Sequence, residues 1–242
     1  MKKQTGFTLI EIMIALVLGL IVLSATIGVY ITTVKGSTDT INSARLNHDL
    51  ESVMSLMVND LRRSGYWGGA RTGADSSTNP FTIGAANIQT PSASCILYTY
   101  DGGSGVTGGV NHDSNGLVDA DEYYGFQLTG GAITMRTTGT TTANCADGNW
   151  ETMTIDSGGQ SLNITALTFT TAYKCLNVST STPYSTTCAA VATAGNLVIE
   201  QKASESRQFN IVLTGQLVND TTVTKTLTST VKVRNDRIFT QP

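Results

Sequence analysis

A long apolar stretch near the N-terminus constrains this chain more than any other feature. From Phe7 to Val34 the only charged side chain is that of Glu11. A helix needs roughly 20 apolar residues to cross a bilayer, so this stretch is long enough to do so. Lys2 and Lys3 precede it, which by the positive-inside rule places its start in the cytoplasm and the rest of the chain outside. Glu11 needs an explanation, because a charge at the bilayer centre costs about 2.5–3.5 kcal/mol even on insertion scales.

The apolar residues become periodic after Lys35-Gly36-Ser37. Spacings of 4, 3, 4 and 4 place one stripe on a single helical face, formed by Leu46, Leu50, Val53, Met57 and Leu61. Polar residues fill the other positions, among them Asn47, Asp49, Glu51, Asn59 and Asp60. We therefore predict that the membrane helix continues into an amphipathic helix, which packs against the rest of the protein and ends near Arg62-Arg63-Ser64-Gly65.

The remainder of the chain has the composition of an exported, β-rich domain. Only 14% of residues are charged, and the formal net charge is −3 without a lysine or arginine cluster, so nucleic acid is not an expected partner. A Gly/Ser/Thr-rich loop from Gly68 to Thr90 precedes a series of β-prone stretches. We expect strands at Ile96–Tyr100, Tyr123–Leu128, Ala132–Arg136, Ser161–Tyr173, Leu197–Gln201, Gln208–Leu217 and Val223–Val233. The last two form a hairpin through Val218–Thr221, and the predicted fold is α+β, a long N-terminal helix on an antiparallel sheet.

Four cysteines lie in this β-rich part, at positions Cys95, Cys145, Cys175 and Cys188. They form no Cys-x-x-Cys pair, so a zinc site is not expected. An even number of cysteines after a membrane segment favours two disulfides in an oxidising compartment. Three pairings are possible, and we prefer Cys95–Cys145 with Cys175–Cys188 because each joins neighbours along the chain.

The N-terminal residues carry a family resemblance. Gly6-Phe7-Thr8-Leu9-Ile10-Glu11, after a short basic leader and before a long apolar run, resembles the type III signal of type IV pilins and their relatives. The resemblance implies that a prepilin peptidase cuts after Gly6 and N-methylates Phe7, and it maps the family's conserved glutamate onto Glu11. An ordinary secretory signal fits less well, since only Leu23-Ser24-Ala25 weakly resembles its cleavage site.

The resemblance also implies the organisation of the chain and a role for Glu11. Residues 1–6 form the leader, 7–35 the hydrophobic helix, 36–65 the amphipathic helix and 66–242 the head. Cleavage creates an ammonium group at Phe7, and Glu11 can pair with such an amine, its own or that of a neighbouring subunit, in a low-dielectric helical bundle. Our hypothesis is that Glu11 thereby selects subunits for assembly.

A second motif narrows the family. Asp60-Leu61-Arg62-Arg63-Ser64-Gly65-Tyr66-Trp67-Gly68-Gly69-Ala70 resembles the LRRxGYWGG junction of PilW-type minor pilins. This resemblance implies a minor pilin that enters a type IV pilus near its tip and helps to initiate assembly. The implied partners are other minor and major pilins through the N-terminal helix, the prepilin peptidase and a tip adhesin. The chain would lie in the inner membrane before assembly and in the surface pilus afterwards.

Three alternatives stay open. One is a minor pseudopilin of type II secretion, of the J class, another is a competence pilin, and the third is a membrane-anchored periplasmic ligand-binding protein. An enzyme is not expected, because His48 and His112 are the only histidines available for acid–base chemistry. The stretch from Gly102 to Gly109 lacks the Gly-Lys-Ser/Thr ending of a phosphate loop.

Residues 111–122 match the spacing of a twelve-residue calcium loop. The expected ligands are the side chains of Asn111, Asp113, Asn115, Asp119 and Glu122 and the backbone carbonyl of Leu117, with Gly116 at the sixth position. Asp101 and Asp121 are reserve ligands. The flanks do not look like two helices, and Asp-Ser-Asn-Gly is also ordinary turn chemistry, so a polar surface turn is the alternative.

Overall fold

The computed structural model describes residues 6–68, 76–102, 106–107, 110–111, 116–154, 162–218 and 220–241. The chain divides into two compact units, Met1–Arg45 and Leu46–Pro242. The boundary falls inside the helix α1 (Leu9–Leu61), which is continuous over 53 residues. Each unit is described by itself below.

The first unit contains the apolar part of α1 and the polar segment 35–45 that follows it. Every residue from 6 to 41 is exposed, and this part of the helix is long and apolar enough to cross a membrane. An α-helix satisfies its backbone hydrogen bonds internally, which makes it one of the two structures that hydrocarbon tolerates. The sequence prediction of a spanning helix is therefore consistent with the structure.

The second unit begins where α1 becomes amphipathic. The predicted stripe is buried, with exposed fractions of 0% at Leu50, Met57 and Leu61. Met54 and Val58 widen the buried face. One expectation is wrong: Asp60, placed on the polar face, is only 9% exposed. Its position three residues after Met57 lies on the same face as Leu61, so the helical period turns it inward.

The strands in the described part of the chain form two five-stranded antiparallel sheets rather than the single sheet expected, besides a small ribbon. The first sheet has the order β1-β2-β5-β6-β7. Its strands are β1 (Gln89–Ser92), β2 (Cys95–Thr99), β5 (Tyr123–Thr129), β6 (Ala132–Thr138) and β7 (Asn149–Thr152). All five residues of β2, which lies between β1 and β5, are buried, and its Ile96 and Tyr98 belong to the core.

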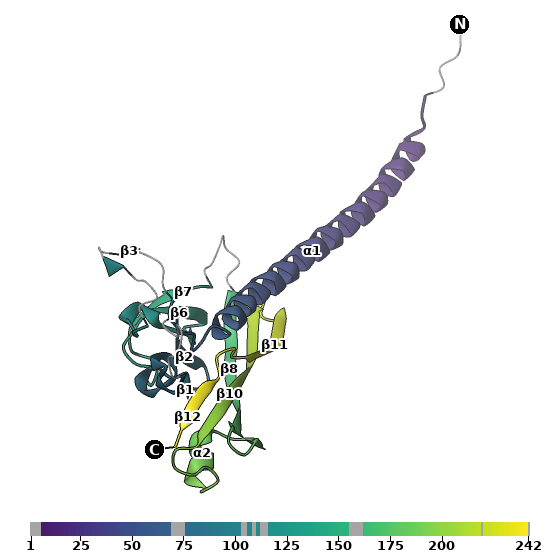
Figure 1. Ribbon diagram of the computed structural model, residues 1–242. Coiled ribbons are helices and arrows are strands. Elements are labelled where there is room, and N and C mark those ends of the chain that lie inside the picture. The colour runs from purple at the N-terminus through teal and green to yellow at the C-terminus, as the bar shows by residue number, and fades with distance from the viewer. Residues whose placement is uncertain are drawn as a thin grey trace. The chain divides into compact units, whose positions relative to one another are not determined.

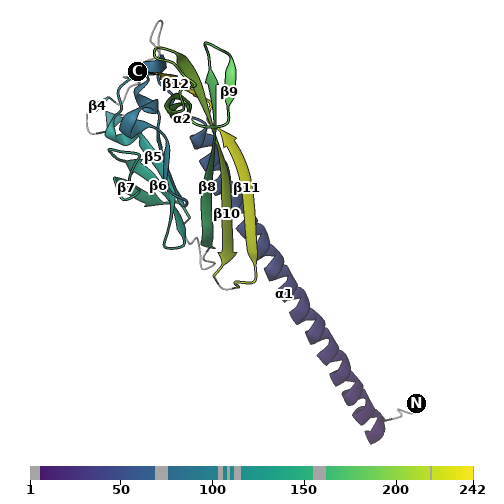
Figure 2. The ribbon, with the colours of Figure 1, turned by 90° about the horizontal axis from the view of Figure 1, so that it is seen from below.

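The second sheet has the order β11-β10-β8-β9, with β12 pairing to β10. Its strands are β8 (Leu162–Asn177), β9 (Thr182–Tyr184), β10 (Lys202–Leu217), β11 (Thr224–Lys232) and β12 (Arg237–Thr240). The long strands β8, β10 and β11 lie side by side in Figures 1 and 2. The predicted hairpin is present, with Gln208 opposite Lys232 and Gln216 opposite Thr224.

The remaining elements are short. They are β3 (Val106–Thr107), β4 (Val110–Asn111), α2 (Cys188–Thr193) and the 3₁₀ turns η1 (Ser76–Thr78), η2 (Pro80–Thr82), η3 (Gly84–Ala86) and η4 (Ala120–Glu122). The strand expected at Leu197–Gln201 is wrong, because the backbone turns there. Glu200 has a positive φ of 67°, which lies in the left-handed region rather than in the β region of a strand.

One core joins the two sheets to α1. Ile96 and Phe126 of the first sheet and Phe209 and Ile211 of the second are at most 1% exposed, and they belong to the same cluster as Leu50. Each such side chain contributes about 1.5–3 kcal/mol by leaving water. A smaller cluster is formed by Cys175 of β8, Cys188 and Val191 of α2, Leu197 and Ala203. The core of the second unit, Leu46–Pro242, is therefore closed by residues of that unit.

The cysteine pairing follows the preferred prediction. Cys95 is bonded to Cys145, and Cys175 to Cys188. The first disulfide ties the buried strand β2 to the segment before β7, and the second ties β8 to the first residue of α2.

Candidate functional site

The predicted processing point lies just outside the helix. Gly6, Phe7 and Thr8 precede α1 without helical structure, and the side chain of Phe7 is 84% exposed. Proteases cut exposed chain termini and loops far more readily than regular structure. The bond between Gly6 and Phe7 is therefore placed where an enzyme can reach it, while the helix behind it stays intact.

Glu11 has a local partner that the sequence prediction missed. Its Oε2 atom accepts the Thr8 N–H at 2.9 Å and the Thr8 Oγ1–H at 2.8 Å. The Glu11 N–H points back to Thr8 Oγ1 at 3.4 Å. Thr8 and Glu11 thus form a reciprocal cap at the start of α1, and the pattern Thr-x-x-Glu before an apolar run is its sequence signature. The carboxylate is also at the positive end of the helix dipole, which favours its charge.

The apolar surface behind this cap is uncovered. Large apolar side chains from Leu9 to Val34 are between 45% and 77% exposed. Monomeric soluble proteins rarely expose contiguous apolar patches of more than a few hundred Å². At 1.5 Å per residue these residues extend over about 39 Å, which exceeds a hydrocarbon core of roughly 30 Å. This surface requires lipid or other apolar helices around it.

The end of α1 is bonded to the head through Asp60. The phenol of Tyr98 donates to Asp60 Oδ2 at 2.5 Å, and that of Tyr100 donates to Oδ1 at 2.8 Å. Arg63 lies one turn further, with its guanidinium 4.2 Å from the centre of the Tyr100 ring and 3.9 Å from Asp60. Burial, followed by the charge of Asp60, raises the pKa of both phenols well above their usual value. Both tyrosines therefore stay protonated and act as donors.

The chain leaves α1 through a turn that requires glycine. Gly65 has a φ of 73°, and a Cβ there would lie 2.9 Å from Thr82 Cγ2. Its N–H donates to the carbonyl of Thr99 at 2.8 Å, at the end of β2. Its carbonyl accepts the side-chain amide of Asn79 at 2.9 Å. Gly65 of the junction motif thus ends the helix, and both its N–H and its carbonyl are hydrogen-bonded to the head.

The residues after Gly65 continue along the end of β2. The carbonyl of Tyr66 accepts the Asp101 N–H at 2.9 Å, and the Gly68 N–H donates to Asp101 Oδ2 at 2.9 Å. The indole of Trp67 donates to the Gly116 carbonyl at 3.2 Å. Asp101, named only as a reserve calcium ligand, is therefore a structural partner of the junction.

The predicted calcium loop is only partly described. Asp113 and Asn115 lie outside the described residues, as does His112, and Asn111 is described only as the backbone of β4. Leu117 is 66% exposed. Asp119 and Glu122 form a reciprocal cap around η4, in which Glu122 Oε2 accepts the Asp119 N–H at 2.9 Å. Calcium binding by this loop stays a prediction.

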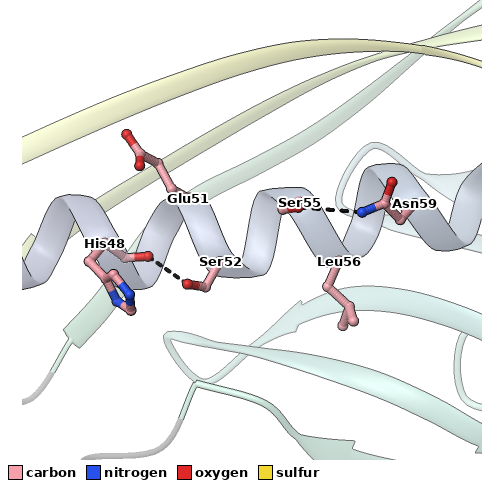
Figure 3. Close-up of a pocket in the computed structure, with 6 residues that line it drawn as sticks. All are labelled: His48, Glu51, Ser52, Ser55, Leu56 and Asn59. Carbon is pink, nitrogen blue, oxygen red and sulfur yellow. Dashed lines mark hydrogen bonds between the residues drawn. The ribbon is translucent and has the colours of Figure 1, made fainter.

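A shallow hollow lies beside the amphipathic part of α1. Figure 3 shows the six residues from consecutive helical turns that line it. They are His48, Glu51, Ser52, Ser55, Leu56 and Asn59. Ser52 already donates to the His48 carbonyl at 2.8 Å, and Asn59 donates to Ser55 at 3.4 Å. His48 is exposed beside Asp49. These groups converge on no common point and indicate no ligand.

Comparison with protein families agrees with this geometry. Residues 1–27 match the prokaryotic N-terminal methylation motif, and residues 39–233 match the family described as prepilin peptidase-dependent protein B. No curated protein and no solved structure matched the chain.

A match to the N-terminal methylation motif, an uncovered apolar helix and a disulfide-bonded α+β head define a type IV pilin-like protein. The second match extends over most of the sequence. The chain therefore belongs to the prepilin peptidase-dependent protein B family.

Proposed function

We propose that this chain is a minor pilin of a type IV pilus, processed after Gly6 and N-methylated at Phe7. The junction at Leu61–Gly68, with its resemblance to PilW-type minor pilins, supports the finer assignment. The protein would enter the pilus near the tip and help to initiate assembly, in contact with other minor and major pilins and a tip adhesin. Before assembly it would span the inner membrane once, with the head in the periplasm.

The observation that carries the proposal is the uncovered apolar part of α1. The head closes its own core, so the apolar side chains from Leu9 to Val34 serve no packing purpose within the chain. Lipid covers such a surface before assembly, and the helices of neighbouring subunits cover it afterwards. Both environments accept the same helix, because its backbone hydrogen bonds are already made.

Glu11 would act when the helix leaves lipid for the filament. In the free chain its carboxylate is bonded to Thr8, which lowers the cost of keeping a charge near the membrane. An N-terminal ammonium at Phe7 of its own or a neighbouring subunit would then replace one of two neutral donors with a charged one. The Thr8 bonds are already charge-assisted on the acceptor side, and an ammonium donor adds a Coulombic attraction that is strong in a low-dielectric helical bundle. The exchange favours subunits that dock in the correct register.

Mass spectrometry of sheared and purified pili tests the proposal. We expect a fragment that begins at N-methylated Phe7, and pili should be reduced or absent in a deletion strain. Glu11→Val should be cleaved and inserted but scarce in filaments, whereas Val17→Ile, an apolar control on the same helix, should be incorporated normally. Normal piliation on deletion, with loss of type II secretion, would instead assign the chain to the pseudopilins. Equal incorporation of Glu11→Val and wild type would remove the role of Glu11.

A further inference from the structure

Two buried acidic residues, Asp101 and Glu122, lie near each other beside the junction, just after the end of β2. Asp101 is 2% exposed and Glu122 is 5% exposed. Asp101 directly precedes Gly102, and the Gly102 N–H donates to Glu122 Oε1 at 3.0 Å. The charges that act on Glu122 are those of Asp101 and Asp119, which are both negative. Burying like charges together is expensive unless a cation or proton compensates them.

One oxygen of this pair has no partner. Asp101 Oδ2 accepts the Gly68 N–H, but Asp101 Oδ1 is buried and accepts no hydrogen bond from the described residues. An unsatisfied buried carboxylate oxygen is rare in native proteins and often marks a missing water or ion. Glu122 accepts one N–H at each oxygen, which uses two of about four lone-pair positions and leaves two for a further ligand.

We propose that Asp101 and Glu122 bind one Ca²⁺ ion at the end of β2, next to the Gly68 end of the helix junction. All available donors are oxygens, which favours a hard cation over zinc. No three acidic or histidine side chains converge among the residues that the structure describes. The ion therefore takes its other ligands from backbone carbonyls and water, which Ca²⁺ tolerates at irregular geometry and Mg²⁺ does not.

Burial and the two neighbouring carboxylates raise the pKa of Glu122 to about 7, which agrees with a position that lacks a compensating charge. The site also has a structural consequence. Asp101 is bonded to Gly68, and Trp67 is bonded to the Gly116 carbonyl on the chain that leads to η4. A cation between Asp101 and Glu122 would fix the exit from α1 to the segment that ends at η4.

The test uses the full chain in detergent, freed of metal with a chelator and titrated with CaCl₂. The tryptophan fluorescence of the chain, to which Trp67 contributes beside the site, should change with saturation at one Ca²⁺ per chain, at a Kd of about 0.1–1 mM, as in extracellular modules. Thermal unfolding should shift upward with Ca²⁺ and much less with Mg²⁺. Asp101→Asn keeps an acceptor for Gly68 and should weaken binding at least about tenfold, whereas Glu151→Gln, an exposed acidic control, should bind as wild type.

Undiminished binding by Asp101→Asn would overturn the proposal. Equilibrium dialysis of the wild-type chain provides a measurement that does not depend on the folding of any variant. Less than one bound Ca²⁺ per chain at saturating concentrations, well above about 1 mM, would also overturn it.

Discussion

Replacement of Asp60 by alanine should destabilise the head more than any substitution of an exposed acid on α1. Asp60 is the acceptor for two buried phenols, those of Tyr98 and Tyr100. Alanine leaves both donors without a partner in a site where Tyr98 is 0% exposed. An unsatisfied buried donor costs about 1–3 kcal/mol, but removal of the carboxylate also returns part of its own desolvation cost. We therefore expect a loss of about 2–4 kcal/mol in the free energy of unfolding.

Urea unfolding of the full chain in a mild detergent measures this loss through the fluorescence of Trp67 and Trp150, by linear extrapolation. Asp49→Ala is the matched control, because Asp49 lies on the same helix with its side chain 58% exposed. It should change stability by no more than about 0.5 kcal/mol.

A triple variant separates hydrogen bonding from general disruption of the helix. Asp60→Ala combined with Tyr98→Phe and Tyr100→Phe removes the acceptor together with both donors, so no orphaned group remains. Its cost should be smaller than the sum of the three single changes. The reasoning fails if the costs simply add, or if Asp60→Ala is no more destabilising than Asp49→Ala.

Three further predictions address the turn, a disulfide and the effect of alkali. Gly65→Ala should cost more than about 1 kcal/mol because of its positive φ, whereas Gly36→Ala, with open space around its Cβ on the helix, should be neutral or stabilising in urea unfolding. Alanine at both Cys95 and Cys145, which are 50 residues apart, should lower the unfolding free energy by about 4 kcal/mol relative to the oxidised chain. Burial raises the pKa of Tyr124 to about 12, so its contribution to stability is complete below the unfolded value of about 10 and is lost as pH rises from there to 12. The urea midpoint of wild type should accordingly fall more between these pH values than that of Tyr124→Phe.

The features that could be predicted from sequence are those set by local periodicity. The apolar run and the stripe from Leu46 to Leu61 follow the helical period, and both correspond to the structure. The hairpin of β10 and β11 could be predicted from the sequence because its two strands are neighbours along the chain with a turn between them. The division of the strands into two sheets could not be predicted, since strand pairing between distant segments leaves no local signal in the sequence.

Buried polar groups account for two other failures, the start of β10 and the position of Asp60. β10 begins at Lys202, six residues before the predicted strand, in a segment whose inward positions include Glu205 and Arg207. Glu205 accepts the Cys188 N–H at 2.8 Å, and Arg207 donates to Asn87 at 2.5 Å. Such partners come from elsewhere in the chain, so a charged residue on a buried face hides the strand pattern. The burial of Asp60 was missed for the same reason, because its partners Tyr98 and Tyr100 are distant in the sequence. Its spacing of three residues from Met57 was the one sequence signal for its burial.

The position of the junction explains why so many bonds gather there. A subunit that moves from membrane to filament, as proposed, carries load along α1 into the head. The Gly65 N–H is bonded to the carbonyl of Thr99 at the end of the first sheet. The carbonyls of Arg62 and Ser64 accept from Arg234 and Asn235, which lie between β11 and β12 of the second sheet. Because the turn that follows α1 is bonded to β2 of the first sheet and to the segment between β11 and β12 of the second, we expect force on the helix to be shared by both sheets rather than borne by one strand.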